Sequence, residues 1–170
     1  GGDEVKPEPG TPRRAGFATV LMSSWSLYAN YPTLASGGYT HPITLNLYTD
    51  AASAAAHMPV KSVTQVFTIP WRPVADPTCP GGTAWRSPAN NACYNGYAFT
   101  ITFDLRALNY DLPARFIYGV AYDTNSWGYN PLGVPGPYES LNVGLNTASP
   151  ATTVGPDVDT DPVYWKTRVA

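Results

Sequence analysis

Two stretches with a regular pattern of hydrophobic and polar positions, joined by a short polar link, occupy the middle of the chain. In residues 98–105 one face carries Phe99, Ile101, Phe103 and Leu105, and the other carries Thr100, Thr102 and Asp104. This period of two, in aromatic and β-branched residues, predicts a β-strand. Residues 115–123 are apolar on both faces, which predicts a strand that is central or covered on both sides. We expect the two strands to be antiparallel neighbours in the middle of the core.

Shorter segments of the same character predict further strands. These segments are residues 17–22, 43–48, 62–69, 140–146 and 163–169. Gln65 is an odd polar member of the apolar face of its segment. Residues 50–58 favour one or two helical turns, but their alanines bury too little area for a core helix. Seven or eight strands joined by long loops predict an all-β fold, an antiparallel two-sheet sandwich that is more jelly-roll-like than immunoglobulin-like.

Composition supports the all-β prediction and bounds the domain count. The 170 residues suffice for one domain with a single core. Glycine and proline are abundant (15 and 18), whereas charged residues are too few for the wet faces of long amphipathic helices. Residues 1–14 contain Pro7, Pro9 and Pro12, which predict an extended linker or tail. We therefore expect a tail over residues 1–14 and one sandwich domain over residues 15–170.

The charge pattern argues against two classes of partner. The formal net charge is −2 and the ten lysines and arginines are scattered, so neutralisation of nucleic-acid phosphates is disfavoured. No apolar run approaches the roughly 18 residues that a membrane span needs. The chain opens on Gly1 and Gly2 and not on Met, which fits a processed mature chain and fits a cloned fragment equally well.

Cys79 and Cys93 are the two cysteines, and both lie in a polar loop rich in Pro, Gly and Asn. Such a pair predicts a disulfide, which implies an oxidising compartment: the periplasm, the cell surface or the medium. Closing a loop of about 15 residues contributes about 3 kcal/mol in the chain-entropy interpretation. The alternative is a metal pair, but no histidine lies nearby to complete a zinc site.

An acidic alternation near the C-terminus is a candidate metal site. Asp157, Asp159 and Asp161 point the same way in an extended segment, where their mutual repulsion favours a cation such as calcium between them. The spacing does not form an EF-hand loop, because Pro162 follows directly. The alternative is a solvated acidic edge that discourages edge-to-edge strand pairing.

Aromatic residues in two long loops are candidate ligand-binding groups. The candidate rings are Trp71, Trp85, Trp127, Tyr129 and Tyr138. Flat rings beside asparagine amides suit sugars, which stack through their apolar faces and hydrogen-bond through their hydroxyls. The same residue types suit a protein interface. The alternative is that these rings pack the loops onto the sandwich as satellite clusters.

Motifs for catalysis are missing from the sequence. Neither His41 nor His57 neighbours a nucleophile motif, and no G-x-S-x-G elbow occurs. A glycoside hydrolase would need two carboxylates about 5–10 Å apart in a cleft. We therefore expect a protein that is not an enzyme.

Five stretches of the chain carry a resemblance to a known group of domains. They read SVTQVFTIPWRP, CYNGYAFTITFDL, IYGVAYDTNSWGYNPLG, YESLNVGL and DVDTDPVYW. Together they resemble uncharacterised secreted bacterial β-sandwich domains of exported or surface-anchored proteins over roughly residues 43–165. The resemblance implies fold and location, since that group has no established activity. Its members usually continue past the point where this chain stops, which implies either a trimmed chain or a last strand that is missing or supplied by a partner. A sandwich that lacks a strand would expose an edge that invites strand addition from another chain.

These observations predict a non-catalytic extracellular binding module that recognises a glycan or another extracellular protein, with calcium as the one candidate cofactor. The alternative is a structural or accessory subunit of an extracellular or periplasmic assembly. In both cases we expect the protein to be secreted, at the cell surface or in the periplasm.

Overall fold

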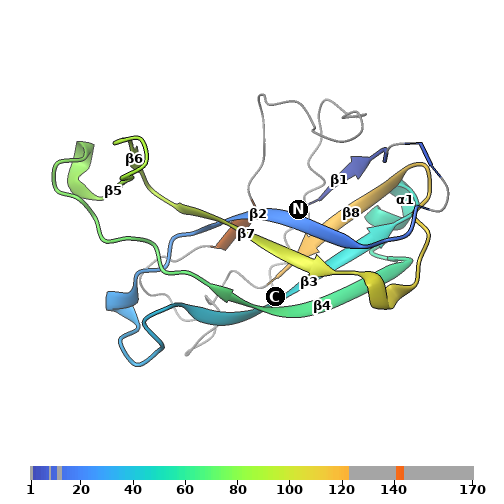
Figure 1. The fold of residues 1–170 in the computed structure, drawn as a ribbon, viewed down its shortest axis with the longest axis horizontal. Coiled ribbons are helices and arrows are strands. Elements are labelled where there is room, and N and C mark those ends of the chain that lie inside the picture. The colour runs from blue at the N-terminus through green and yellow to red at the C-terminus, as the bar shows by residue number, and fades with distance from the viewer. Residues whose placement is uncertain (1, 8, 11–12, 123–140, 144–170) are drawn as a thin grey trace.

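The computed structural model describes residues 2–7, 9–10, 13–122 and 141–143, and they form an antiparallel β-sandwich (Figure 1). The four-stranded sheet has the order β1 (Gly2–Val5), β8 (Phe116–Ala121), β3 (Tyr39–Tyr48) and β4 (Lys61–Ile69). The three-stranded sheet has the order β7 (Tyr97–Asp104), β2 (Phe17–Ser24) and β9 (Leu141–Val143). A separate small hairpin pairs β5 (Trp85–Arg86) with β6 (Cys93–Tyr94). The predicted all-β fold is confirmed.

Alternation along the strands places the core between the two sheets. The largest fully buried apolar side chains come from both sheets: Met22, Ile43, Leu45, Ile69 and Phe103. Phe103 of β7 meets Phe67 of β4 edge to face, with ring centroids 4.9 Å apart. The polar residues of the same strands face outwards, where Thr19 pairs with Thr102 and Thr44 with Thr64 through their hydroxyls. Burial of the apolar face is the main stabilising contribution of these strands.

The predicted pairing of the two middle strands is wrong. β7 and β8 lie in opposite sheets, and β7 pairs with β2 whereas β8 pairs with β1 and β3. The link between them contains a 3₁₀ turn, η3 (Arg106–Leu108), followed by Asn109 in a left-handed conformation at φ 45°. This turn carries the chain across the sandwich instead of folding it back as a hairpin. The chain likewise passes from one sheet to the other between β1 and β2 and between β2 and β3.

β8 is an inner strand with both faces covered, as its two apolar faces predict. Val120 faces the core, and Ile117 on the outer face is only 2% exposed. The ring of Tyr48 lies over Gly119 on that outer face, where an added Cβ would come within 3.1 Å of the ring. The single helical turn α1 (Ala51–Ala55) also contacts β8. Polar side chains on the outer face of β8 would therefore be shielded from water, which is unfavourable unless they find hydrogen-bond partners.

The first residues of the chain depart from the predicted tail. Gly2–Val5 pair antiparallel with β8 and form an edge strand of the four-stranded sheet. Glu4 of this strand also accepts a hydrogen bond from Arg115 at 3.2 Å. Four residues of mixed polarity carry almost no alternation signal, so the sheet edge and not local propensity determines this strand.

α1 confirms the predicted helical turn of residues 50–58. The Asp50 carboxylate accepts a hydrogen bond from the backbone N–H of Ser53 at 2.7 Å. The Ser53 hydroxyl in turn accepts a hydrogen bond from the backbone N–H of Asp50 at 3.2 Å. This reciprocal capping box sets the start of the turn. In the described part of the chain, no helix has the length and apolarity to cross a membrane.

Candidate functional site

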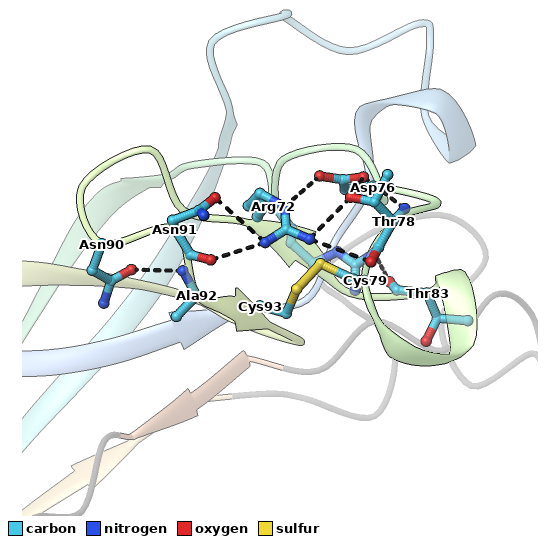
Figure 2. Close-up of a disulfide and its surroundings, with 10 residues drawn as sticks. Arg72, Asp76, Thr78, Cys79, Thr83, Asn90, Asn91, Ala92 and Cys93 are labelled. Atoms are coloured by element: carbon cyan, nitrogen blue, oxygen red, sulfur yellow. Dashed lines mark hydrogen bonds and ion pairs between the residues drawn. A yellow bond between two sulfur atoms is a disulfide. The ribbon is translucent and has the colours of Figure 1, made fainter.

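A disulfide-tied arm extends from one end of the sandwich, beyond the ends of β2, β4 and β7 (Figure 1). The arm comprises residues 72–96 and contains the β5–β6 hairpin and the 3₁₀ turn η2 (Pro80–Gly82). Cys79 and Cys93 form the predicted disulfide, with an S–S distance of 2.03 Å and a Cα–Cα distance of 5.9 Å. The bridge links the start of η2 to β6 (Figure 2). The arm is thus a closed loop with little secondary structure, in which side chains provide most of the order.

Arg86 organises the interior of the arm. Its Nε donates to Asp76 Oδ2 at 3.0 Å, and its Nη1 donates to the carbonyl oxygen of Asn91 at 2.9 Å. Its Nη2 donates to the Thr78 hydroxyl at 2.9 Å. Two separate turns of the arm, one with Asp76 and Thr78 and one with Asn91, therefore meet at one guanidinium, whose planar set of donors suits several acceptors at once. Asp76, Thr78 and Asn91 surround the disulfide in Figure 2.

Asp76 is the acidic partner in this arrangement. Its Oδ1 accepts from the hydroxyl of Thr78 at 2.6 Å and from the backbone N–H of Thr78 at 2.8 Å. The hydrogen bonds from Thr78, followed by Arg86, hold the pKa of the Asp76 carboxyl below its usual range. Asp76 is therefore an ionised structural acceptor and not a candidate general acid.

Arg72 fixes the base of the arm. Its Nη1 donates to the carbonyl oxygen of Asn95 and its Nη2 to that of Thr83, both at 2.8 Å. Its backbone N–H donates to Ser26 O at 2.8 Å, which ties the arm to the segment after β2. Partial burial lowers the pKa of the Arg72 guanidinium. The Arg72 side chain thus joins two points of the arm, and its backbone N–H holds the base of the arm to the sandwich.

Trp85 lies inside the arm and packs against the protein itself. It is 9% exposed, and its Nε1 donates to Gly96 O at 2.8 Å. Its ring lies 5.7 Å from that of Tyr94 and 5.6 Å from that of Tyr97, measured between centroids. This is the packing role that the sequence left open as an alternative for the candidate rings.

Trp71 belongs to a second, separate aromatic cluster. Its ring centroid lies 5.8, 6.0 and 5.2 Å from those of Tyr28, Tyr31 and Tyr39, and the Tyr31 ring is stacked on it. The indole N–H donates to Ala35 O at 2.9 Å. Trp71 therefore anchors the loop of residues 25–38, which includes the 3₁₀ turn η1 (Tyr28–Asn30).

The other candidate site residues lie outside the described residues. They are Trp127, Tyr129, Tyr138, Asp157, Asp159 and Asp161. A binding role for the three rings stays a prediction, as does calcium at the three aspartates. Elsewhere, in the part of the chain that the structure describes, no three His, Cys, Asp or Glu side chains are placed to share a metal ion.

The tip of the arm presents a tyrosine and an asparagine side by side. Asn90 Nδ2 donates to the Tyr94 hydroxyl at 2.6 Å, and Asn90 Oδ1 accepts from Ala92 N at 3.2 Å. Tyr94 is 43% exposed although it rests against Trp85. Asn91 adopts a left-handed conformation at φ 57°, which asparagine tolerates better than most residues, and so shapes the turn. A partly exposed ring is thus held beside an amide on a rigid turn.

Sequence reasoning did not single out Arg72 or Arg86 as parts of the site. A signal was present, because two isolated arginines and one aspartate in a loop poor in charge must find partners within it. Both acceptors of the Arg72 side chain, and one of those of Arg86, are backbone carbonyls, which leave no trace in residue identity. The chain matches no family model, no curated protein and no solved structure. The resemblance to secreted bacterial sandwich domains therefore stays a prediction.

Proposed function

We propose that this chain is a non-catalytic extracellular binding module and that the tip of the disulfide-tied arm is its binding surface. The observation that carries the proposal is the Tyr94–Asn90 pair, held on an arm that Arg86, Arg72 and the disulfide fix in place. A rigid scaffold that presents polar and aromatic groups on a projecting loop is the usual arrangement of binding sites on sandwiches. The disulfide supports an oxidising, extracellular location.

A glycan is the ligand that this tip suits best. The exposed part of the Tyr94 ring offers a flat apolar surface, and the Asn90 amide has one further N–H and one further oxygen lone pair beyond its bonds to Tyr94 and Ala92, which suit hydroxyls. The charged groups of the arm are engaged internally, since Arg86 pairs with Asp76 and Arg72 binds two carbonyls. A strongly charged ligand would therefore find few partners here. Neutral sugars match this chemistry more closely than an acidic or basic protein surface does.

The test is retention of the full chain on a panel of immobilised neutral polysaccharides. Tyr94→Ala should weaken binding by about tenfold or more, as expected for an interface residue worth about 1.4 kcal/mol. Tyr28→Ala is a matched control, because Tyr28 is 38% exposed and its ring lies 5.8 Å from Trp71, much as Tyr94 lies near Trp85. Equal loss in the two variants, or no retention on any polysaccharide, would contradict the proposal.

The alternative is a structural or accessory subunit that pairs strands with another chain.

A further inference from the structure

Arg72 is a cation without a carboxylate partner among the described residues. Four other arginines form ion pairs with carboxylates: Arg14, Arg86, Arg106 and Arg115. The two Nη donors of Arg72 end on neutral backbone carbonyls, and its Nε is buried with no hydrogen-bond partner in the described part of the chain. A partly buried guanidinium without a counter-ion is unfavourable, so a carboxylate formed close to it would be stabilised.

One of the two carbonyls bound by Arg72 belongs to Asn95, which Gly96 follows directly where the arm joins β7. Asparagine before glycine is the pair most prone to lose ammonia, because no side chain shields the backbone nitrogen that attacks. Packing requires the glycine, since an added Cβ at Gly96 would overlap Ser23 Oγ and come within 2.7 Å of Trp25 Nε1. The reactive pair is therefore built into the base of the arm.

We propose that Asn95 is a modification site, at which the side-chain amide converts spontaneously to aspartate or isoaspartate with the help of Arg72. The backbone nitrogen of Gly96 attacks Cγ of Asn95. The new N–Cγ bond forms as the Cγ–Nδ2 bond breaks, and the proton from the Gly96 nitrogen leaves with Nδ2 as ammonia. Water then opens the cyclic imide at either carbonyl, which gives aspartate or isoaspartate.

The contacts around Asn95 favour this attack. Asn95 is exposed and its side chain hydrogen-bonds to none of the described residues, so the amide is free to turn towards the backbone. The Gly96 N–H also donates to none of the described residues, so its nitrogen is available. Arg72 Nη1 donates at 2.8 Å to Asn95 O, the atom that shares the negative charge when the Gly96 nitrogen loses its proton. Arg72 thus stabilises the anion that attacks.

The isoaspartate product also gives Arg72 the counter-ion that it lacks. In isoaspartate the chain continues through Cγ, and the former backbone carbonyl of Asn95 becomes a free carboxylate. The oxygen of that carbonyl is the atom to which Arg72 Nη1 already donates. The neutral acceptor is thereby replaced by an anionic one, which forms the stronger hydrogen bond with a guanidinium.

The two other asparagines of the arm have their attacking nitrogens engaged. At Asn90 the nitrogen would be that of Asn91, which donates to Ser87 O at 2.8 Å. At Asn91 it would be that of Ala92, which donates to Asn90 Oδ1 at 3.2 Å (Figure 2). Neither of these asparagines is followed by glycine. They are therefore internal controls for Asn95.

Mass spectrometry of the full chain, incubated native at mildly alkaline pH, tests the proposal. Trypsin cuts after Arg86 and Arg106, so residues 87–106 form one peptide that contains all three asparagines of the arm. Fragmentation assigns the mass increase of each amide-to-acid conversion to its residue, and a sample without incubation corrects for conversion during digestion. We expect Asn95 to convert at least about tenfold faster than Asn90 or Asn91. Equal rates at the three residues, or no conversion at Asn95, would overturn the proposal.

Arg72→Gln tests the part played by the guanidinium, because it keeps N–H donors and removes the charge. Conversion of Asn95 in the native variant should be slower by about threefold or more. An unchanged or faster rate would overturn the role of Arg72, since a residue that only held the turn rigid would protect Asn95. Arg115→Gln removes an exposed charge elsewhere and should leave the rate unchanged.

Unfolding supplies a further control. In urea, with the disulfide reduced, the contact between Arg72 and Asn95 is lost, so the native chain sequence and Arg72→Gln should convert at the same rate. A difference that persists in urea would show that the effect of Arg72 does not come from the folded arm. The readout is a mass and needs no ligand, so its outcome is independent of the binding test at Tyr94.

Discussion

Gln65 of β4 exchanges two hydrogen bonds with the backbone of Asp104 in β7, across the gap between the two sheets. Its Nε2 donates to Asp104 O, and Asp104 N donates to its Oε1, both at 3.2 Å. The side-chain amide thus imitates a strand partner and satisfies two backbone groups at the edge of β7. This pair closes one side of the sandwich, and the polar residue that interrupts the apolar face of β4 is the one that makes it.

Replacement of Gln65 tests this role. Gln65→Leu keeps the approximate size of the side chain but leaves two partly buried backbone groups without partners, which should cost about 1–3 kcal/mol in the free energy of unfolding. Thr64→Val is the neighbouring control on the outer face and should change the free energy of unfolding by less than about 0.5 kcal/mol. Urea unfolding monitored by tryptophan fluorescence measures both. Equal stability of the two variants would show that Gln65 does not bridge the sheets.

The disulfide should stabilise the arm by restricting its unfolded states. Cys79→Ser with Cys93→Ser should cost about 3 kcal/mol, the value for a closed loop of about 15 residues. Hydrogen exchange should localise the loss to the arm, with faster exchange of the amides of Gly82 and Ser87, whose carbonyl partners Cys79 and Ala92 lie near the bridge. Unchanged exchange in the reduced chain would mean that the arginine contacts alone hold the arm.

Arg86 and Arg115 offer a comparison between a structural and a superficial ion pair. Arg86→Lys keeps the charge but loses the planar set of donors that joins Asp76, Thr78 and Asn91, so about 1–3 kcal/mol of stability should be lost. Arg115→Lys removes a single exposed contact to Glu4 at 3.2 Å and should cost less than about 1 kcal/mol. The readout is the urea midpoint of each variant. Similar losses in both would contradict the central position of Arg86 in the arm.

Asp104 should titrate well below an ordinary carboxyl group. The side-chain hydrogen bonds from Arg106, at 2.9 and 2.7 Å, followed by the backbone N–H of Arg106, lower its pKa to about 2. Because the folded pKa lies below the unfolded value of about 3.9, the contribution to stability is present above about pH 4 and is lost as the pH falls through about 2. Carboxyl NMR of the native protein measures this titration directly.

The control for that titration is Arg106→Ala, which removes the side-chain donors and should return the Asp104 midpoint towards 3.9. A native midpoint already near 3.9 would contradict the assignment. The backbone N–H of Arg106 also donates to Asp104 Oδ1 at 3.1 Å, so this carboxylate at the end of β7 caps the turn that follows.

Strand positions were predictable from the sequence because alternation reports which face is buried. It identified β2, β3, β4, β7 and β8, and it placed Phe103 in the core. Which strands pair with one another was not predictable in the same way. The link after β7 suggested a hairpin, but Asn109 and η3 redirect the chain into the other sheet, and no periodicity in the strands themselves encodes that choice. β1 was missed because a four-residue edge strand is selected by its neighbour β8.

The disulfide of the candidate site was predictable from the sequence, whereas the noncovalent contacts of the arm were not. Two cysteines in a polar loop sufficed for the disulfide. Both side-chain contacts of Arg72 and one contact of Arg86 end on backbone carbonyls, so residue identity gives no hint of them. The aromatic residues show the same limit: Trp85 is internal to the arm while its neighbour Tyr94 is presented, and only packing distinguishes them.

The central claim is that ligand binds at the tip of the arm. Backbone amide chemical shifts of the full chain, recorded with and without the soluble form of a retained neutral polysaccharide, test it most directly. We expect the perturbed amides to cluster around Asn90 and Tyr94, and we expect Tyr94→Ala to abolish the perturbation while Tyr28→Ala does not. Perturbations that centre on the outer faces of the sheets, with the arm unaffected, would show that ligand binds elsewhere.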